Sequence, residues 1–361
     1  LGEEFHQDPR SQKVNLTVGL YYDNEGAIPL LKTVQAAEAR LIAKPQPRPY
    51  LPIEGLASYR SAVQKLVFGA GHEALQSGRV ATIQSVGGTG ALKVGADFLH
   101  AAYPDSQIWI SDPAWDNHHA IFQGAGIKTH TYTYYDPQTK ALLFERMLGD
   151  LSALPRHSIV LLHPCCHNPT GVDLSQEQWL RLIPVLEAHE LIPFLDIAYQ
   201  GFGTGLQEDA FAIRAMADAG LSFLVANSFS KNFSFYAERC GGLSVVCASR
   251  DEAERVLGQL KAIVRRIYSN PPMHGGQVTS TVLNDPELYG LWEQEVAEMR
   301  ARIAFVRQRA HEQLKVKLPG YDSSYFVTQQ GMFSYTGLST AQLHALRDTH
   351  GVYIIDSGRI S

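Results

Sequence analysis

Lys231 stands in the segment Ser228-Phe229-Ser230-Lys231-Asn232-Phe233, directly after an apolar run typical of a buried strand. Burial removes hydration from an amine and makes its neutral, nucleophilic form easier to reach. A solvated lysine has a pKa of about 10.4 and reacts poorly with an aldehyde at neutral pH. A buried Lys231 would therefore suit imine chemistry, although a Ser-x-Ser-Lys pattern alone is more typical of surface strands and loops.

Groups that could bind an anion surround this lysine in the sequence. Ser228, Ser230 and Arg239 offer two hydroxyls and a planar bidentate cation, which suit a phosphate. The segment Gly87-Gly88-Thr89-Gly90 reads as a turn between a strand and a helix, where free backbone N–H groups and a hydroxyl could hold the same group. The alternative is a plain tight connection. The segment does not match G-x-G-x-x-G, which argues against a nicotinamide cofactor.

A carboxylate follows another apolar strand in Phe194-Leu195-Asp196-Ile197-Ala198-Tyr199. A buried charge needs a cationic partner, and a protonated pyridine nitrogen would serve. Tyr199 and Asn168 could hydrogen-bond a hydroxyl on the same ring. With the lysine and the phosphate-binding groups, these residues indicate pyridoxal 5′-phosphate. The simpler interpretation is that Asp196 caps the following turn.

Three further residues could contact a ring or a substrate. Trp115 follows a predicted strand and could stack on a planar cofactor, or it could be an ordinary core residue. Arg265 and Arg359 could each bind a carboxylate, although most arginines are solvated surface groups. The segment His163-Pro164-Cys165-Cys166-His167 resembles a metal cluster, but adjacent cysteines are awkward tetrahedral ligands. We expect no metal there, and a buried pair of reduced thiols instead.

The composition excludes several classes of function. The chain has 361 residues, 45% hydrophobic residues and a formal net charge of −5, with no long basic run, so we expect neither nucleic acid nor an anionic membrane as a partner. No apolar stretch approaches the roughly 20 residues that span a bilayer. The first residues are acidic and show no signal peptide, and four cysteines do not make a disulfide framework. These features favour the cytoplasm.

The elements that must position these residues alternate between strands and helices. Strands separated by helices imply a parallel sheet covered on both faces, with ligands at the carboxyl ends of the strands. The predicted strands are 80–85, 108–110, 128–134, 158–163, 191–197, 223–228 and 242–248, with a further strand or extended segment at 14–20. The predicted helices are 29–40, 91–102, 117–123, 175–189 and 293–314. The long charged helix near the end indicates a second domain that includes the N-terminal segment.

Taken together, these motifs run over essentially the whole chain and strongly resemble the fold type I pyridoxal-phosphate aminotransferases of the aspartate and aromatic subgroup. The resemblance implies an α/β fold with a mostly parallel seven-stranded sheet sandwiched by helices and a smaller α/β domain. It places residues 29–298 in the large domain, and residues 1–28 and 299–361 in the small one. The motifs are Gly88-Thr-Gly90, His167-Asn-Pro-Thr-Gly171, Asp196-x-x-Tyr199-Gln-Gly-Phe202, Ser228-x-Ser-Lys231-Asn-Phe through Arg239, Tyr268-Ser-Asn-Pro-Pro272 and Ser357-Gly-Arg359.

The resemblance also implies a role for each site residue. Lys231 is the imine lysine and proton shuttle, Asp196 binds the pyridine nitrogen, and Arg359 binds the substrate α-carboxylate. The cofactor-binding residues are Gly87, Gly88, Thr89, Trp115 over the ring, Asn168 and Tyr199 at the ring oxygen, Ser228, Ser230, Arg239 and Tyr50 of the partner subunit. The substrate-binding residues are Gly19, Trp115, Asn168, Arg359 and Arg265 of the partner subunit. The implied assembly is an obligate homodimer.

The segments Gly19-Leu20-Tyr21-Tyr22 and Tyr50-Leu-Pro-Ile-Glu-Gly55 resemble the bacterial aromatic branch of this family. The expected reaction is a ping-pong transamination between an aromatic or dicarboxylic L-amino acid and 2-oxoglutarate. Thr89 and Asn270 match the aspartate-type pattern instead, so an aspartate aminotransferase is the alternative. A lyase or decarboxylase on the same fold, or a non-catalytic binding protein, are more remote alternatives.

Overall fold

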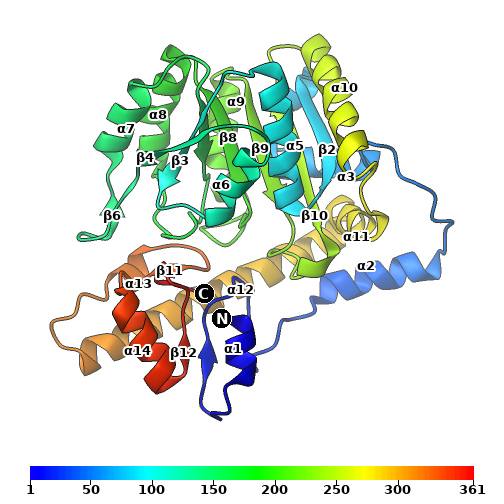
Figure 1. Ribbon diagram of the computed structural model, residues 1–361. Coiled ribbons are helices and arrows are strands. Elements are labelled where there is room, and N and C mark those ends of the chain that lie inside the picture. Colours follow the sequence, from blue (N-terminus) through cyan, green and yellow to red (C-terminus); the bar gives the residue numbers. More distant parts are fainter.

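The computed structural model describes residues 1–361 and contains one large sheet of seven strands in the order β2-β10-β9-β8-β7-β3-β4 (Figure 1). Six strands are parallel, and β10 runs antiparallel to both of its neighbours. This confirms the predicted mostly parallel seven-stranded sheet. The strands are β2 (Val80–Val86), β3 (Ile108–Asp112), β4 (Thr129–Thr133), β7 (Ile159–Leu162), β8 (Ile192–Ile197), β9 (Phe223–Ser228) and β10 (Cys240–Val246).

Helices cover both faces of this sheet (Figure 1). Successive residues of a strand point to opposite faces, so Phe194 of β8 packs into one hydrophobic core and Leu195 into the other. None of the helices combines the length and the hydropathy that a membrane-spanning helix requires. One face carries α5 (Gly87–Ala102), α6 (Asp116–Gln123) and α10 (Arg250–Ile267), and the other carries α3 (Ala57–Phe68), α7 (Phe144–Ser152), α8 (Gln176–Ala188) and α9 (Phe211–Asp218).

The helix α12 (Pro286–Lys317) leads from the sheet to a smaller group of elements that contains both ends of the chain (Figure 1). It contains the predicted helix 293–314. The smaller group comprises α1 (Gly2–Gln7), β1 (Val14–Asn15), α13 (Tyr325–Thr328), β11 (Ser334–Tyr335), α14 (Thr340–His350), β12 (Val352–Tyr353) and β13 (Arg359–Ile360). The remaining elements are α2 (Lys32–Ala43), α4 (Glu73–Gln76), β5 (Tyr135–Asp136), β6 (Ala141–Leu142) and α11 (Met273–Asn284).

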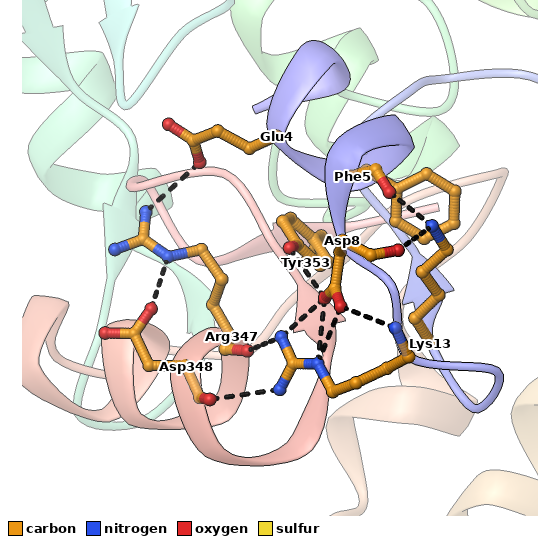
Figure 2. Close-up of polar contacts among 8 residues, drawn as sticks. Glu4, Phe5, Asp8, Lys13, Arg347, Asp348 and Tyr353 are labelled. Atoms are coloured by element: carbon orange, nitrogen blue, oxygen red, sulfur yellow. Dashed lines mark hydrogen bonds and ion pairs between the residues drawn. The ribbon is translucent and has the colours of Figure 1, made fainter.

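Polar contacts bind the N-terminal segment to the C-terminal elements, and Figure 2 shows them. Arg10 donates to both carboxylate oxygens of Asp8 and to the carbonyl oxygens of Arg347 and Asp348, and Tyr353 Oη donates to Asp8 at 2.9 Å. The hydrogen bonds from Arg10 hold the pKa of Asp8 well below its usual value. β1 also pairs with β12 in parallel. The domain boundary near residue 298 stays a prediction, because α12 crosses it without a break.

Most predicted elements differ from the structure by a few residues at their ends, and three differences have a clear physical reason. The strand expected at 14–20 is only Val14–Asn15, because the Asn15 side chain accepts the N–H of Thr17 and turns the chain. The helix expected at 29–40 is α2, which begins at Lys32, where Glu295 accepts the backbone N–H. The segment Gly87-Gly88-Thr89-Gly90, expected as a turn, is the first turn of α5.

Candidate active site

The carboxyl ends of β7, β8 and β9 lie at the same edge of the sheet, because these strands are parallel neighbours. Asp196 lies near the end of β8 and is opposite Ala226 of β9. Lys231 and Asn168 lie in the loops that follow β9 and β7. The fold therefore gathers at one edge three residues that are far apart in the sequence.

Asp196 is buried and has a hydrogen-bond partner within the chain. His118 Nε2 donates to Asp196 Oδ2 at 2.8 Å, since a carboxylate can only accept. Asp196 and Phe194 point to the same face of β8. Helix α6 covers this face and brings His118 to Asp196. Burial raises the pKa of Asp196, but the hydrogen bond and charge of His118 outweigh it and hold that pKa below its usual value. The carboxylate is therefore ionised at neutral pH.

His118 is a partner of Asp196 that was not predicted from the sequence. It follows Trp115 by three residues, and this helical spacing was the available signal. In the structure, the His118 ring contacts the Trp115 indole edge-on, with centroids 5.1 Å apart.

Lys231 is half-buried in the loop segment that follows β9. Burial lowers the pKa of its amine, the charge of Asp196 opposes this shift, and the charges of Arg239 and Arg359 reinforce it. Its Nζ lies 5.0 Å from the centre of the Tyr199 ring. Burial raises the pKa of Tyr199, which keeps its hydroxyl a proton donor. A nucleophilic amine, a carboxylate and a phenol donor thus share one buried region.

The start of α5, the end of β9 and the start of β10 form a cradle of hydrogen-bond donors. Because β10 is antiparallel, it begins at the edge where β2 and β9 end, and this brings Arg239 beside Gly87. Arg239 Nη1 donates to Ser230 Oγ at 3.3 Å, and the Gly87 N–H donates to the Arg239 carbonyl at 2.9 Å. A Cβ at Gly87 would lie 2.6 Å from Arg239 Nη2, and one at Gly88 would lie 3.1 Å from Ser228 Cβ. At Gly87, where φ is +67°, both the backbone conformation and this close approach favour glycine.

A cavity of about 400 Å³ lies at the other end of the site, and Trp115, Asn168 and Arg359 all line it. Arg359 donates to Asn168 Oδ1 at 3.2 Å and to the Thr17 carbonyl at 2.9 Å. Its guanidinium lies 4.3 Å from the centre of the Phe333 ring. Gly19 packs so closely on this ring that a Cβ would lie 2.8 Å from Phe333 Cζ. The predicted substrate residues of this subunit are therefore neighbours.

Tyr50 and Arg265 lie outside this cavity. Tyr50 is 90% exposed, and Arg265 is exposed and hydrogen-bonds only to Ser269 Oγ, at 2.5 Å. Neither residue lines the cavity that contains Arg359. In a single subunit, these two residues do not join the other predicted site residues.

Two groups of side chains have ligand types that metals use. His118, His163 and Asp196 form one group, and their ligand atoms lie within 4.8 Å of one another. Burial lowers the pKa of His163 to about 4, so this imidazole is neutral at pH 7. Cys165, Cys166 and Asp209 form the second group, and both cysteines are buried and free. The thiol pair agrees with the predicted buried, reduced cysteines.

The chemistry of these donors fits pyridoxal 5′-phosphate. The glycine and arginine cradle suits a phosphate, Asp196 suits a protonated ring nitrogen, and Lys231 suits an aldehyde. Tyr199 can donate to a ring oxygen. A side chain at position 87 would push Arg239 away, because a Cβ there would lie 2.6 Å from Arg239 Nη2. The close approach of Arg239 to the Gly87 backbone is the feature that suits a tightly held phosphate.

Comparisons with known proteins agree with this geometry. The family model described as aminotransferase class I and II matches residues 11–361. The chain is 58% identical to the tyrosine aminotransferase of Klebsiella pneumoniae, over 100% of this chain and 91% of that protein, and 54% identical to the aspartate aminotransferase of Pseudomonas aeruginosa, over 100% and 90%. It is also similar to the crystal structure of an aromatic-amino-acid aminotransferase from Burkholderia pseudomallei covalently bound to pyridoxal phosphate. That likeness has a TM-score of 0.98 and 49% identity, and covers 99% of this chain and 90% of the other. Pyridoxal phosphate is the cofactor of this chain, and the chain belongs to the class I and II aminotransferases.

Proposed function

We propose that this aminotransferase moves the amino group between an aromatic L-amino acid and 2-oxoglutarate, and that it also accepts dicarboxylic amino acids. The observation that carries the proposal is the shared sheet edge, where the amine of Lys231 lies close enough to Asp196 and Arg359 for their charges to act on it. The tyrosine aminotransferase named above supports the aromatic preference. Thr89, Asn270 and the similar aspartate aminotransferase favour the second candidate, an enzyme that prefers aspartate.

The residues of the cofactor side would act on charge and protons. Bound pyridoxal phosphate supplies an aldehyde and an electron-withdrawing ring that stabilises negative charge at the substrate Cα. Lys231 Nζ removes the proton from Cα as a general base and later acts as a general acid. Asp196, oriented by His118, keeps negative charge at the ring nitrogen. The Tyr199 hydroxyl and Asn168 donate to the ring oxygen.

The residues of the substrate side would place Cα within reach of that amine. The planar Arg359 guanidinium presents two parallel donors to the α-carboxylate, and Phe333 and Asn168 fix its orientation. Trp115 borders the same cavity and can stack on the cofactor ring. Gly19 packs directly on the Phe333 ring, where a Cβ would lie 2.8 Å from Cζ, and so helps to hold the ring that supports Arg359. Orientation of this kind contributes to rate because it fixes the reacting atoms before the reaction begins.

We also propose a homodimer in which Tyr50 of the partner subunit binds the phosphate and Arg265 of the partner subunit binds a side-chain carboxylate. The high exposure of both residues in one subunit supports this. A hybrid of Lys231→Ala and Arg265→Ala subunits would contain one complete site, so mixing the two variants should restore turnover of aspartate. Failure to restore turnover of aspartate in proven hybrids would contradict the shared site.

We also propose that residues 29–298 form the large domain and that residues 1–28 and 299–361 form the small one. We further propose a cytoplasmic location, which the four free cysteines support.

The experiment that tests the substrate is a comparison of kcat/KM for L-phenylalanine and L-aspartate, with 2-oxoglutarate as acceptor. The comparison uses the wild type, Arg265→Ala and the control Arg266→Ala, which changes the exposed neighbouring arginine. We expect turnover of both amino acids in the wild type. Arg265→Ala should lower the value for aspartate about 10²-fold more than that for phenylalanine, because only aspartate loses an ion pair.

The outcomes separate the candidate functions. Turnover of aspartate with none of phenylalanine would favour the aspartate aminotransferase. Consumption of the amino acid without transfer of its amino group would favour a lyase or decarboxylase. An equal loss for both substrates in Arg265→Ala would contradict the role of Arg265.

A further inference from the structure

The loop that carries Lys231 is held by a buried tryptophan from a distant helix. Trp292 in α12 is 0% exposed, and its Nε1–H donates to the Asn232 carbonyl oxygen at 2.8 Å. Its ring also stacks on Phe233, with centroids 4.8 Å apart and planes at 30°. Both contacts fall on the two residues that directly follow Lys231. Trp292 therefore contacts the loop immediately after Lys231.

Other hydrogen bonds also hold the loop between β9 and β10. Within the loop, the Phe233 N–H donates to the Phe229 carbonyl at 3.2 Å, and the Ser234 N–H donates to the Lys231 carbonyl at 3.0 Å. The Asn232 side chain donates to the Gln200 carbonyl at 3.2 Å. The Trp292 bond reaches the loop from α12 and holds the carbonyl of the Asn232–Phe233 peptide, whose N–H is the one bonded to Phe229. A shift of this peptide would act through Asn232 on the backbone of Lys231 and would move its side chain relative to Tyr199.

The same helix holds two other parts of the site. Arg300 donates to the Gly201 carbonyl at 2.8 Å, in the loop that follows Asp196 and Tyr199. Arg307 donates to the Phe333 carbonyl at 2.7 Å, and Phe333 lies under the guanidinium of Arg359. One continuous helix thus contacts the Lys231 loop, the Tyr199 loop and the support of Arg359.

We propose that Trp292 is a positioning residue for Lys231, and that α12 sets the distance between this lysine and the substrate-binding arginine. The inference rests on the proposed role of Lys231 in the reaction. Loss of the indole N–H would leave the Asn232 carbonyl without its donor, and the Asn232–Phe233 peptide would be held only by the hydrogen bond of its N–H to Phe229. The amine would then sit less accurately relative to the Tyr199 ring and to Asp196, whose charge acts on the pKa of Lys231. The proposal predicts a change in the chemistry of Lys231 in addition to any loss of stability.

Trp179 provides a matched control. It is 2% exposed and belongs to the same hydrophobic core as Trp292, but it lies in α8, and its indole N–H makes no hydrogen bond within the chain. Trp292→Phe and Trp179→Phe each remove one buried indole and keep a ring. Both variants should therefore lower the melting temperature of the holoenzyme. If Trp292 has only a structural role, Trp292→Phe and Trp179→Phe should also have the same effect on the chemistry of Lys231.

The test measures the apparent pKa of the cofactor chromophore, from its visible absorption across a pH titration, and kcat at saturating substrate. We expect Trp292→Phe to shift the chromophore pKa and to lower kcat about 10-fold, because a small misplacement of a catalytic group is costly. Trp179→Phe should leave both values unchanged. Phe233→Leu, which removes the stack and keeps the indole N–H, should shift the pKa in the same direction by less, and carries the test if Trp292→Phe does not fold.

Two results would overturn the inference. One is an unshifted chromophore pKa and an unchanged kcat in the variants of Trp292 and Phe233. The other is an equal shift in Trp179→Phe. A visible cofactor band that survives unchanged in Lys231→Ala would instead contradict the proposed role of Lys231. Failure of the inference about Trp292 can therefore be distinguished from failure of the proposed function.

Discussion

The cofactor side and the substrate side of the site are built in different ways. On the cofactor side, Asp196, Ser228 and Gly87 lie in or beside strands of one sheet, whose main-chain hydrogen bonds fix their register. On the substrate side, Arg359 lies on a two-residue strand, and Trp115 and Asn168 lie in loops. Tyr50 and Arg265 are exposed to solvent in one subunit. With the proposed roles, the residues that act on the cofactor are held by the sheet, whereas the residues that select the substrate are held by less regular segments.

The largest expected effect on the cofactor side comes from Lys231→Ala. Loss of the amine removes both the covalent attachment and the general base, so kcat should fall by roughly 10⁴-fold for every substrate. Steady-state kinetics with phenylalanine and aspartate measure this, with the exposed Lys315→Ala as control. A variant that kept wild-type turnover would remove the basis for assigning the chemistry to the sheet edge.

A smaller loss is expected from Asp196→Asn. The change leaves the ring nitrogen without its counter-ion, and breaking a buried charge pair costs about 3–5 kcal/mol, so kcat/KM should fall about 10³-fold for aromatic and dicarboxylic substrates alike. Kinetics of this variant and of the exposed control Asp218→Asn measure the effect. If the loss depended strongly on the substrate, the proposed separation between the two sides of the site would be wrong.

Arg359→Lys should affect the substrate side. Lysine keeps the charge but loses the two parallel donors, so we expect kcat/KM to fall about 10²-fold, chiefly through KM. The chromophore pKa should change less than in Asp196→Asn. The exposed Arg309→Lys is the control. A loss confined to kcat, with KM unchanged, would contradict a role in binding.

The smallest expected effect is a change in the free energy of unfolding at acidic pH, and it comes from His163, which is buried near Asp196 on the cofactor side. The pKa of His163 is about 4 in the folded chain, below the value near 6.5 in the unfolded chain. The unfolded chain therefore binds the proton first, and the stability that this group contributes at neutral pH is lost as the pH falls from about 6.5 to 4. Between pH 7 and 5, His163 should account for about 2 kcal/mol of lost unfolding free energy.

His163→Asn should remove this part of the acid sensitivity, as measured by urea unfolding at pH 7 and pH 5. The exposed control His344→Asn should leave it unchanged. The same loss between pH 7 and 5 in His163→Asn as in the wild type would show that another group titrates.

Much of the cofactor side could be predicted from the sequence, because strands such as 223–228 are apolar runs with clear ends. The direction of β10 could not, since its residues are as apolar as those of a parallel strand, yet this direction brings Arg239 to Gly87. Glycines also disfavour helices, so their place in the first turn of α5 was missed.

Partners contributed by other elements were the hardest to predict. His118 and Trp292 act on Asp196 and on the loop of Lys231, but neither lies in the same segment as its partner. A sequence shows spacing within a segment, and contacts between segments depend on packing. The substrate side consists mostly of such contacts, which is why the ranking of substrates needs a measurement.

The most direct test of the central claim is to reduce the holoenzyme with borohydride and to locate the bound cofactor by mass spectrometry of its peptides. Reduction converts an imine between the cofactor and a lysine into a stable amine. The proposed site predicts the label on Lys231, in the peptide that spans Ser228 to Arg239. A label on another lysine, or no label on a holoenzyme that transfers amino groups, would contradict it.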